Sequence, residues 1–310
     1  MSQTGPVSDA DVQRREFDLA DGRRLEAFLV GWDTTDDSAP VVVDHHGTPG
    51  CGHPGRLLVA AAADRGLRVL APTRPGYGRS TRQPGRSVAA VAADVAVLLD
   101  QLGVATATVF GGSGGGPHSL ATAALLPGRI TACATVAGVG PYQAAGLDFL
   151  AGMGQGNIDE FGAALAGEVP LRAFLDAERP QILGATAEQI ADAMQTLLPA
   201  VDRAVMTGVL AQDVVANFGG ALAPGVDGWL DDDVAFTRPW GFELSALADT
   251  PVTIWQGHLD LMVPQAHGRW LAAALPHATA HLLPDDGHLS IAAGRIGQIL
   301  DDLTQAPAAR

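Results

Sequence analysis

One stretch of the chain decides its fold, and it reads Thr106-Ala107-Thr108-Val109-Phe110-Gly111-Gly112-Ser113-Gly114-Gly115. Its first half is rich in β-formers, which predicts a buried strand. The glycines that follow allow a sharp turn with little bulk around Ser113, and a helical pattern begins directly after them. A helix that starts here directs its N-terminal amides and its dipole at the serine oxygen. The stretch therefore predicts an activated serine, Ser113, on a strand-to-helix turn.

A glycine-rich phosphate loop is the alternative interpretation of this turn. The chain has no Gly-Lys-Ser or Gly-Lys-Thr to suit a P-loop. A dinucleotide-binding turn normally opens its fold and has an acidic residue about 20 positions further on. The turn at Ser113 instead follows the third parallel-strand candidate. Both facts favour a nucleophile over a phosphate cradle.

Outward from this stretch, short apolar runs alternate with longer helical patterns, which is typical of βαβ units around a buried parallel sheet. Parallel strands are expected at Val41–Asp44, Leu67–Ala71, Thr106–Phe110, Ile130–Val136, Pro251–Gln256 and Ala278–Leu283. Helices are expected at Gly55–Asp64, Ser87–Leu102, Gly114–Leu125, Val263–Ala274 and Leu289–Asp302. Two more strands, Glu16–Leu19 and Arg24–Val30, form a hairpin before them. The prediction is an α/β fold with a mostly parallel eight-stranded sheet flanked by helices.

The alternation breaks between residues 141 and 238, a segment that we call the lid. It is too long for a loop inside a compact domain. Its helical patterns lie at Leu147–Ala151, Ile158–Ala166, Leu171–Leu183, Ala187–Leu198 and Val201–Phe218. We expect a core of residues 1–140 and 239–310, with the lid inserted after the sixth strand over the ligand-binding end of the sheet. Trp229, Trp240 and Phe242 are candidates to line an apolar substrate pocket, with packing of the lid as the alternative.

A second candidate loop follows the strand Val41–Asp44 and reads His45-His46-Gly47-Thr48-Pro49-Gly50. A tetrahedral intermediate needs two donors fixed in advance, and we predict the backbone N–H groups of Thr48 and Gly114 for this oxyanion hole. Metal binding is an alternative for the histidines here, but no carboxylate or cysteine completes a ligand set. We expect no metal and no cofactor, and structural hydrogen bonds for His45 and His46.

Two more polar residues follow predicted strands. Asp260 comes after Pro251–Gln256, and His288 lies on a glycine-flanked turn after the last strand. Alone, Asp260 is equally well explained as an N-cap of the helix at Val263. Because strands of one parallel sheet end on the same side, Ser113, Asp260 and His288 can meet there. We predict a triad in which His288 accepts the Ser113 proton and Asp260 holds the imidazole tautomer.

The composition narrows the partners of the chain. Its formal net charge of −15 disfavours nucleic acid and anionic membrane surfaces. No apolar run approaches the roughly 20 residues of a membrane helix. The polar segment up to Arg15 predicts a cytoplasmic protein without a signal peptide. Cys51 and Cys133 have no CxxC spacing and are expected to be reduced. The expected partner is a small-molecule substrate, and a homodimer is left open.

Four motifs in this order resemble the α/β-hydrolase superfamily. The turn at Ser113 is similar to its G-x-S-x-G nucleophile elbow, and the order serine, acid, histidine also matches. The segment 46–50 resembles the H-G-x-P-G loop of the branch with proline iminopeptidases, esterases and carbon–carbon hydrolases. The segment 74–80 resembles the R-P-G-x-G-x-S loop of the family, where Arg74 is expected to be structural. The resemblance covers residues 16–303 and implies the α/β-hydrolase fold.

The residues depart from some members of this superfamily. Proline iminopeptidases usually carry a tryptophan after the nucleophile, where Gly114 stands here. Haloalkane dehalogenases and epoxide hydrolases carry an aspartate in the place of Ser113. The resemblance implies a serine hydrolase that cleaves a small, mostly apolar ester, thioester, lactone or amide through an acyl-enzyme. The alternatives are a carbon–carbon hydrolase or other cofactor-free reaction, a proline iminopeptidase-like peptidase, and a non-enzymatic ligand receptor on the same fold.

Overall fold

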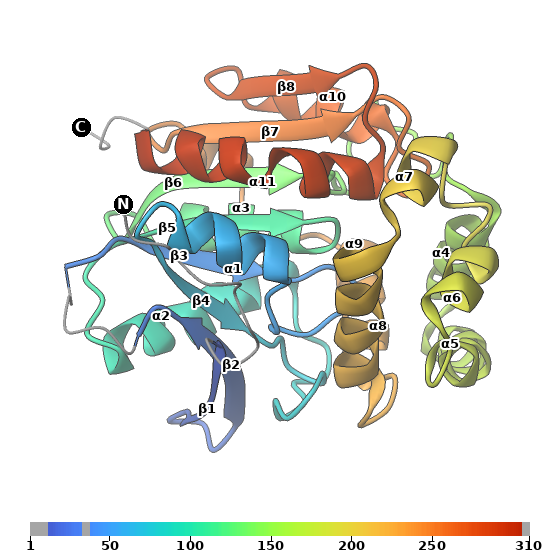
Figure 1. Cartoon of the computed structure of the whole chain (residues 1–310), viewed down its shortest axis with the longest axis horizontal. Helices are drawn as coiled ribbons and strands as arrows, with labels where there is room; N and C mark the ends of the chain where they lie inside the picture. The colour runs from blue at the N-terminus through green and yellow to red at the C-terminus, as the bar shows by residue number, and fades with distance from the viewer. Residues whose placement is uncertain (1–11, 33–37, 306–310) are drawn as a thin grey trace.

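The computed structural model describes residues 12–32 and 38–305, and its centre is one eight-stranded sheet (Figure 1). The strands lie in the order β1-β2-β4-β3-β5-β6-β7-β8. Their bounds are β1 Val12–Asp18, β2 Arg24–Val30, β3 Val41–His45, β4 Arg68–Pro72, β5 Ala107–Gly112, β6 Ile130–Val136, β7 Val252–Gly257 and β8 Thr279–Leu283. β1 and β2 pair antiparallel with their neighbours, and β3 to β8 run parallel. The predicted mostly parallel sheet is confirmed.

The first strand is longer than the predicted Glu16–Leu19. β1 already begins at Val12, within the polar segment up to Arg15. Only Phe17 of this strand is buried, so the sequence carries no apolar alternation there to indicate a strand. Residues 1–11, and residues 33–37 between β2 and β3, lie outside the described residues.

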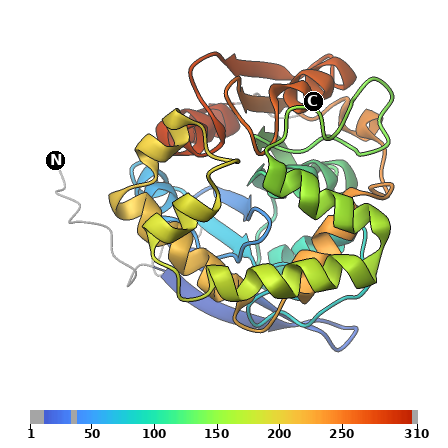
Figure 2. The ribbon, with the colours of Figure 1, turned by 90° about the vertical axis from the view of Figure 1, so that its right-hand side faces the viewer.

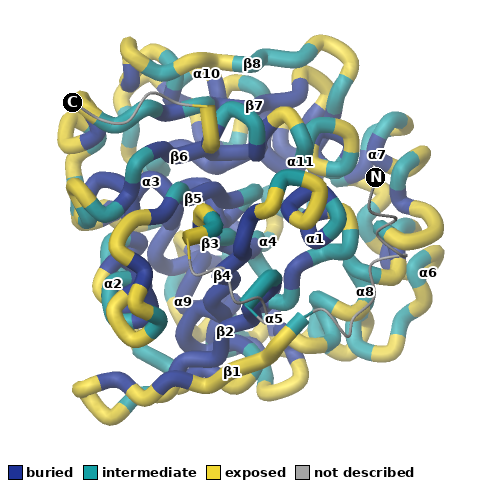
Figure 3. The backbone as a smooth tube through the Cα atoms, turned by 60° about the vertical axis from the view of Figure 1, so that its left-hand side comes forward, coloured by how far each residue is buried: buried dark blue, intermediate teal, exposed yellow. Residues whose placement is uncertain are grey.

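Helices cover both faces of the sheet (Figure 1). The helices α1 (Arg56–Ala63) and α11 (His288–Gln305) pack with Val42 of β3 in one apolar cluster. The helices α2 (Val91–Gln101), α3 (Gly115–Leu125) and α10 (Gln265–Ala274) pack in another cluster with Val43, the next residue of the same strand. Successive side chains of a strand point to opposite faces, which explains the near-continuous apolar runs of β3 and β4. Figure 3 draws the tube of these central strands mostly in the dark blue of buried residues.

The lid helices stand at the edge of the sheet where the parallel strands end, and Figure 2 views them from that side. Their bounds are α4 Gln155–Ala166, α5 Glu168–Ile182, α6 Ala187–Ala193, α7 Ala200–Val205, α8 Gly208–Leu222 and α9 Asp227–Phe236. The chain enters the lid after β6 and returns to the sheet at β7, which confirms the predicted place of the insertion. Its boundaries at residues 141 and 238 stay a prediction. Within the described ranges, no helix is both long and apolar enough to span a bilayer.

Some helix predictions in the lid are wrong. The helix expected at Val201–Phe218 is split into α7 and α8, because Thr207 is extended and Gly208 has a φ of +54°. The pattern Leu147–Ala151 forms turns, since glycines with positive φ flank it and leave too few residues for a stable helix. The helix expected at Ala187–Leu198 ends at Ala193, where the chain continues in turns.

The strand order reverses between β3 and β5. From β3 the chain passes to β4 on one side, and from β5 it passes to β6 on the other side. The loops after β3 and β5 therefore diverge, and ligands of open α/β sheets bind in the crevice that such loops leave. The loop after β3 carries His46 to Gly50, and the turn after β5 carries Ser113.

Candidate active site

Ser113 occupies the tight turn between β5 and α3. Its φ is +54°, in the left-handed region that a residue with a side chain rarely adopts. Its N–H donates to the carbonyl of Val136 at 2.9 Å, and its own carbonyl accepts from the Gly116 N–H at 2.9 Å. Its side chain is half-buried, and Oγ forms no hydrogen bond with any residue of the described ranges. The turn thus holds a serine in a strained conformation with a free hydroxyl, which is the backbone geometry of a nucleophile elbow.

Asp260 and His288 form a buried, hydrogen-bonded pair. Asp260 Oδ2 lies 2.8 Å from His288 Nδ1, while Oδ1 accepts the N–H groups of Met262 and Val263 at 2.8 Å each. The carboxylate therefore holds its own loop and the imidazole at once. The alternative of an N-cap is wrong, because the helix begins at Gln265 with Pro264 as its N-cap and the two amides that Asp260 binds lie before it. Because the carboxylate must accept, Nδ1 donates, and Nε2 of His288 is left to accept a proton.

The third contact of the predicted triad is not made in this structure, since Ser113 Oγ and His288 share no hydrogen bond. The two residues nevertheless follow strands that end at the same edge of the sheet. Burial alone lowers the pKa of His288, but the Asp260 carboxylate, and then Asp202, outweigh burial and leave this pKa above its ordinary value. The electrostatics favour a proton on His288 once it has taken one.

The loop after β3, residues 45–50, runs alongside the nucleophile. A Cβ added at Gly47 would lie 3.5 Å from Ser113 Cβ. A Cβ added at Gly114 would overlap the hydroxyl of Thr48 and come within 3.0 Å of Phe236 on α9. The N–H groups of Thr48 and Gly114 donate to no other residue in the described part of the chain. Two uncommitted amides beside a serine are the donors that an oxyanion requires.

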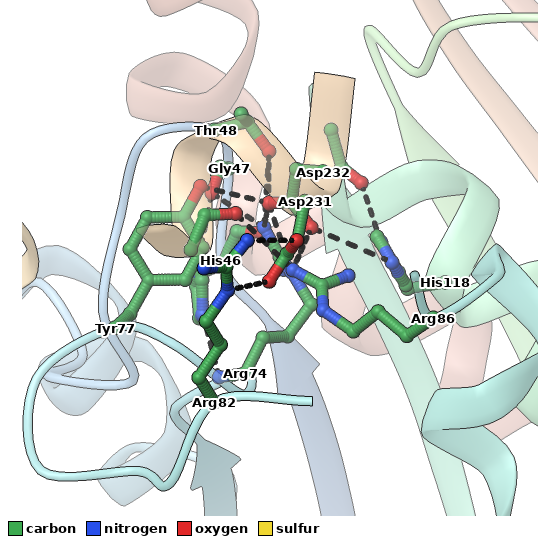
Figure 4. Close-up of polar contacts among 12 residues, drawn as sticks. His46, Gly47, Thr48, Arg74, Tyr77, Arg82, Arg86, His118, Asp231 and Asp232 are labelled. Carbon is green, nitrogen blue, oxygen red and sulfur yellow. Dashed lines mark hydrogen bonds and ion pairs between the residues drawn. The ribbon is translucent and has the colours of Figure 1, made fainter. Parts of the chain in front are cut away.

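Arg74 fixes the 45–50 loop from the segment that follows β4 (Figure 4). Its guanidinium donates to the carbonyl oxygens of His46 and Gly47 and, at 3.1 Å, to Thr48 Oγ1. The side chain is almost entirely excluded from solvent. Arg74 is structural, as its place in the sequence motif suggested, because each of these bonds restrains the peptide before the predicted oxyanion amide.

Asp232, on lid helix α9, completes this network. One of its carboxylate oxygens accepts from Arg74 at 2.7 Å, from the Thr48 hydroxyl at 2.7 Å and from the Tyr77 hydroxyl at 2.9 Å. The other lies 2.6 Å from Arg86. Burial by itself raises the pKa of this carboxyl, but the guanidinium groups of Arg74 and Arg86 hold the pKa well below its ordinary range. A charged lid residue therefore ties the lid to the 45–50 loop.

The histidines of this loop make structural hydrogen bonds. His46 Nε2 accepts the N–H of Arg74 at 3.0 Å, so Nδ1 carries the proton and donates to the carbonyl of Gly47 at 2.7 Å. His45 Nε2 lies 2.9 Å from Thr122 Oγ1. Burial, then the charge of Arg74, lowers the pKa of His46 well below its ordinary value and that of His45 to about 3. Among the described residues, no group of three His, Cys, Asp or Glu side chains is arranged to hold a metal ion.

The three aromatic residues predicted to line a pocket lie in two places. Trp240 and Phe242 stack with ring centroids 5.8 Å apart and line a groove of about 440 Å³, together with Trp270. Trp229 instead packs in an apolar cluster that joins the lid to the core, and its Nε1 donates to Glu160 at 2.7 Å. The structure brings Trp240 and Phe242 together in a groove that is lined by none of Ser113, Asp260 and His288, and it leaves Trp229 among packing residues.

Several buried acids were missed at the level of sequence. Asp202 and Asp232 are fully buried, and Asp233 is buried beside Glu160. Burial, then the nearby carboxyl of Glu160, raises the pKa of Asp233 well above its ordinary value, and burial raises that of Glu160 to about 7. No local signal marks these residues, because acids in a helical pattern are normally solvated.

Comparison with known proteins places this chain in a family. The family model for the alpha/beta hydrolase fold matches residues 40–293. An uncharacterized hydrolase of Bacillus subtilis, YcgS, is 31% identical over 38% of this chain and 39% of its own length. Epoxide hydrolase B of Mycobacterium tuberculosis is 33% identical over 47% of this chain and 41% of its own length. These matches thus span about two fifths of each relative.

A solved structure shows the same arrangement over almost the whole chain. The enol-lactonase from Burkholderia xenovorans superposes with a TM-score of 0.62 at 22% identity and covers 92% of this chain and 98% of its own. At that identity the likeness shows the fold alone. The family model and the shared fold agree with the architecture of the sheet and its helices. The chain belongs to the alpha/beta hydrolase fold family.

Proposed function

We propose that the chain is a serine hydrolase that cleaves a small, mostly apolar ester, thioester, lactone or amide through Ser113, His288 and Asp260. The observation that carries the proposal is the 2.8 Å hydrogen bond between His288 Nδ1 and Asp260 Oδ2, at the sheet edge where Ser113 stands on its strained turn. That bond fixes the tautomer in which Nε2 can accept a proton. The free Ser113 hydroxyl supplies a proton and a nucleophile.

The reaction follows from these groups. His288 Nε2 takes the proton of Ser113 Oγ as the oxygen attacks the substrate carbonyl, and the amides of Thr48 and Gly114 bind the oxyanion. His288 then gives the proton to the leaving group. Water attacks the acyl-enzyme with His288 as base, which releases the acid and restores the hydroxyl of Ser113.

The class of substrate rests on the site rather than on the relatives. A serine at position 113 supports an acyl-enzyme, and the apolar ring of Phe236 lies beside Gly114, next to the proposed oxyanion hole. A peptidase of the proline iminopeptidase kind is less well supported, because Thr48 and Phe236 already fill the space beside Gly114 that a larger residue would need. We also propose a cytoplasmic location, since Cys51 and Cys133 are free and buried.

Replacement of Ser113 by alanine tests the proposal. With p-nitrophenyl acetate as a generic short-chain ester, S113A should keep no more than a few per cent of the wild-type kcat/KM, because the nucleophile is lost. Ser87→Ala is the matched control, since Ser87 is half-buried and its hydroxyl caps no helix. A fluorophosphonate should label the wild type and S87A on a serine, and should not label S113A.

Other outcomes of this test separate the alternatives. Substantial ester turnover by S113A would contradict the proposed nucleophile. Labelling of Ser113 without repeated turnover of any ester would favour a ligand receptor. Labelling with turnover only of substrates that bear a carbon–carbon bond beside a ketone would favour a carbon–carbon hydrolase.

A further inference from the structure

Asp202, a residue of lid helix α7, lies against the first turn of α11. Its Oδ2 accepts the N–H of His288 at 2.8 Å, and its Oδ1 accepts those of Leu289 at 3.0 Å and Ser290 at 2.9 Å. The side chain is fully buried. The first N–H groups of a helix have no partner within the helix, and here one carboxylate from a separate domain segment takes three of them. The first helical residue that it holds is the predicted catalytic base.

The carboxylate of Asp202 fits against the core because residue 287 is a glycine. A Cβ added at Gly287 would lie 2.5 Å from Asp202 Oδ2 and 2.6 Å from Oδ1. Any larger residue before His288 would therefore push the carboxylate away from the helix. Gly287 itself is held by its N–H, which donates to Ser290 Oγ at 2.7 Å. The turn that carries the base is shaped to receive the lid residue.

We propose that Asp202 is a positioning residue for the base His288, so that the lid holds the imidazole in its catalytic place and supports its protonated form. This inference rests on the proposed function, because it assigns a role within the same triad. Asp202 touches neither the reacting atoms nor the ring, and it acts through the backbone of residues 288–290 and through its charge. The lid therefore contributes to catalysis as well as covering the sheet edge.

Both the charge and the hydrogen bonds of Asp202 act on His288. Among the described titratable groups, Asp260 from the loop after β7 and Asp202 from α7 are the carboxylates that raise the pKa of His288 against the effect of burial. Asp260 contacts the ring directly, whereas Asp202 stands behind its backbone. Loss of the Asp202 charge should therefore lower the pKa of His288, and loss of its hydrogen bonds should loosen the imidazole.

Asp202→Asn and Asp202→Ser test the proposal, with Asp213→Asn as the matched control. Asp213 is also a lid carboxylate, on α8, and it accepts the N–H of Arg56 at 2.7 Å at the start of α1. Through this bond and a 2.7 Å ion pair with the Arg56 guanidinium, it anchors the lid to the core away from His288. Asn keeps one acceptor of the same shape, and Ser is a favoured N-cap without charge, which protects the fold of the second variant.

The readouts are the NMR titration of the His288 ring and the pH profile of kcat/KM for p-nitrophenyl acetate. In D202N and D202S the His288 pKa should fall, the acid limb of the profile should move to lower pH, and kcat should drop about tenfold while KM stays within about twofold. D213N should match the wild type in the titration and in kcat. Wild-type titration and profile in both Asp202 variants would overturn the proposal and leave Asp202 as a lid anchor only.

Two further observations keep the result clear. If neither Asp202 variant folds, hydrogen exchange of the wild type decides, since the amides of His288, Leu289 and Ser290 should be protected, and free exchange there would overturn the proposal. The ring titration requires no turnover. A failure of the serine hydrolase proposal, seen as undiminished activity in S113A, is therefore distinguishable from a failure of the role assigned to Asp202.

Discussion

Asp232 and Asp202 both reach from lid helices to a loop of the predicted site, but different groups balance their charges. Asp232 is paired with the guanidinium groups of Arg74 and Arg86 and binds the Thr48 hydroxyl. Asp202 is held by backbone N–H groups at the start of α11. The first carboxylate neutralises buried cations, whereas the second complements a helix dipole. Ion pairs thus hold the loop of the predicted oxyanion hole, whereas a helix cap holds the backbone of the predicted base His288.

The largest expected effect comes from Asp232→Asn. Removal of this charge leaves two buried guanidinium groups without a counterion, and breaking a buried ion pair costs about 3–5 kcal/mol. The free energy of unfolding in urea should fall by that amount. The corresponding loss in D202N should be only about 1 kcal/mol, because asparagine is also a good N-cap.

Tyr77→Phe is the mild control for that comparison. It removes one hydrogen bond to Asp232, of 2.9 Å, and leaves both ion pairs in place. We expect a loss of about 1–2 kcal/mol in the same urea titration, because a hydrogen bond to a charged group is removed. Equal losses in D232N, D202N and Y77F would contradict the distinction between the two carboxylates.

These same residues show where sequence reasoning succeeds and where it fails. β5, the turn at Ser113 and α3 could be predicted, since apolar runs and glycines are local signals. Helix α9 was missed as a helix because its residues are buried all round, so it has no amphipathic period. The partners of Asp232 lie more than a hundred residues away, 158 positions in the case of Arg74. Contacts of that separation leave no pattern in a single sequence.

Gly114→Ala changes the predicted oxyanion hole through a residue of the core, whereas Asp232→Asn changes it through a residue of the lid. The added methyl would overlap Thr48 Oγ1 and lie 2.8 Å from Thr48 Cβ, so the 45–50 loop must move. Displacement of one oxyanion donor costs roughly 10²–10³ in kcat, and we expect about the lower figure with KM little changed. The measurement is the steady-state kinetics of p-nitrophenyl acetate hydrolysis, with urea unfolding to show that the fold is retained. A KM effect without a kcat effect would place Thr48 in substrate binding and not in the oxyanion hole.

The smallest effect on activity is expected at a lid acid that bonds only to the lid. Glu160 accepts from Trp229 and lies beside Asp233, and burial raises its pKa to about 7 from the ordinary 4.5. Between these values the folded chain keeps a proton that the unfolded chain has released, so the wild type loses stability as pH rises through this window. Glu160→Gln removes that dependence. From pH 5 to pH 8, its unfolding free energy should gain on that of the wild type by on the order of 1 kcal/mol for each unit by which the pKa is raised.

The pH profile of ester hydrolysis in Glu160→Gln should match that of the wild type, because Glu160 holds no loop of the predicted site. A shift of that profile as large as the one in D202N would mean that lid acids act on His288 whether or not they touch its helix. That outcome would mean that the lid acts on His288 through long-range electrostatics, and not through hydrogen bonds to the first turn of its helix. Both changes remove a carboxyl group from the same lid, but only Asp202 contacts the helix of His288. The comparison of E160Q with D202N therefore tests whether this contact is needed or whether the loss of a lid carboxyl group is enough.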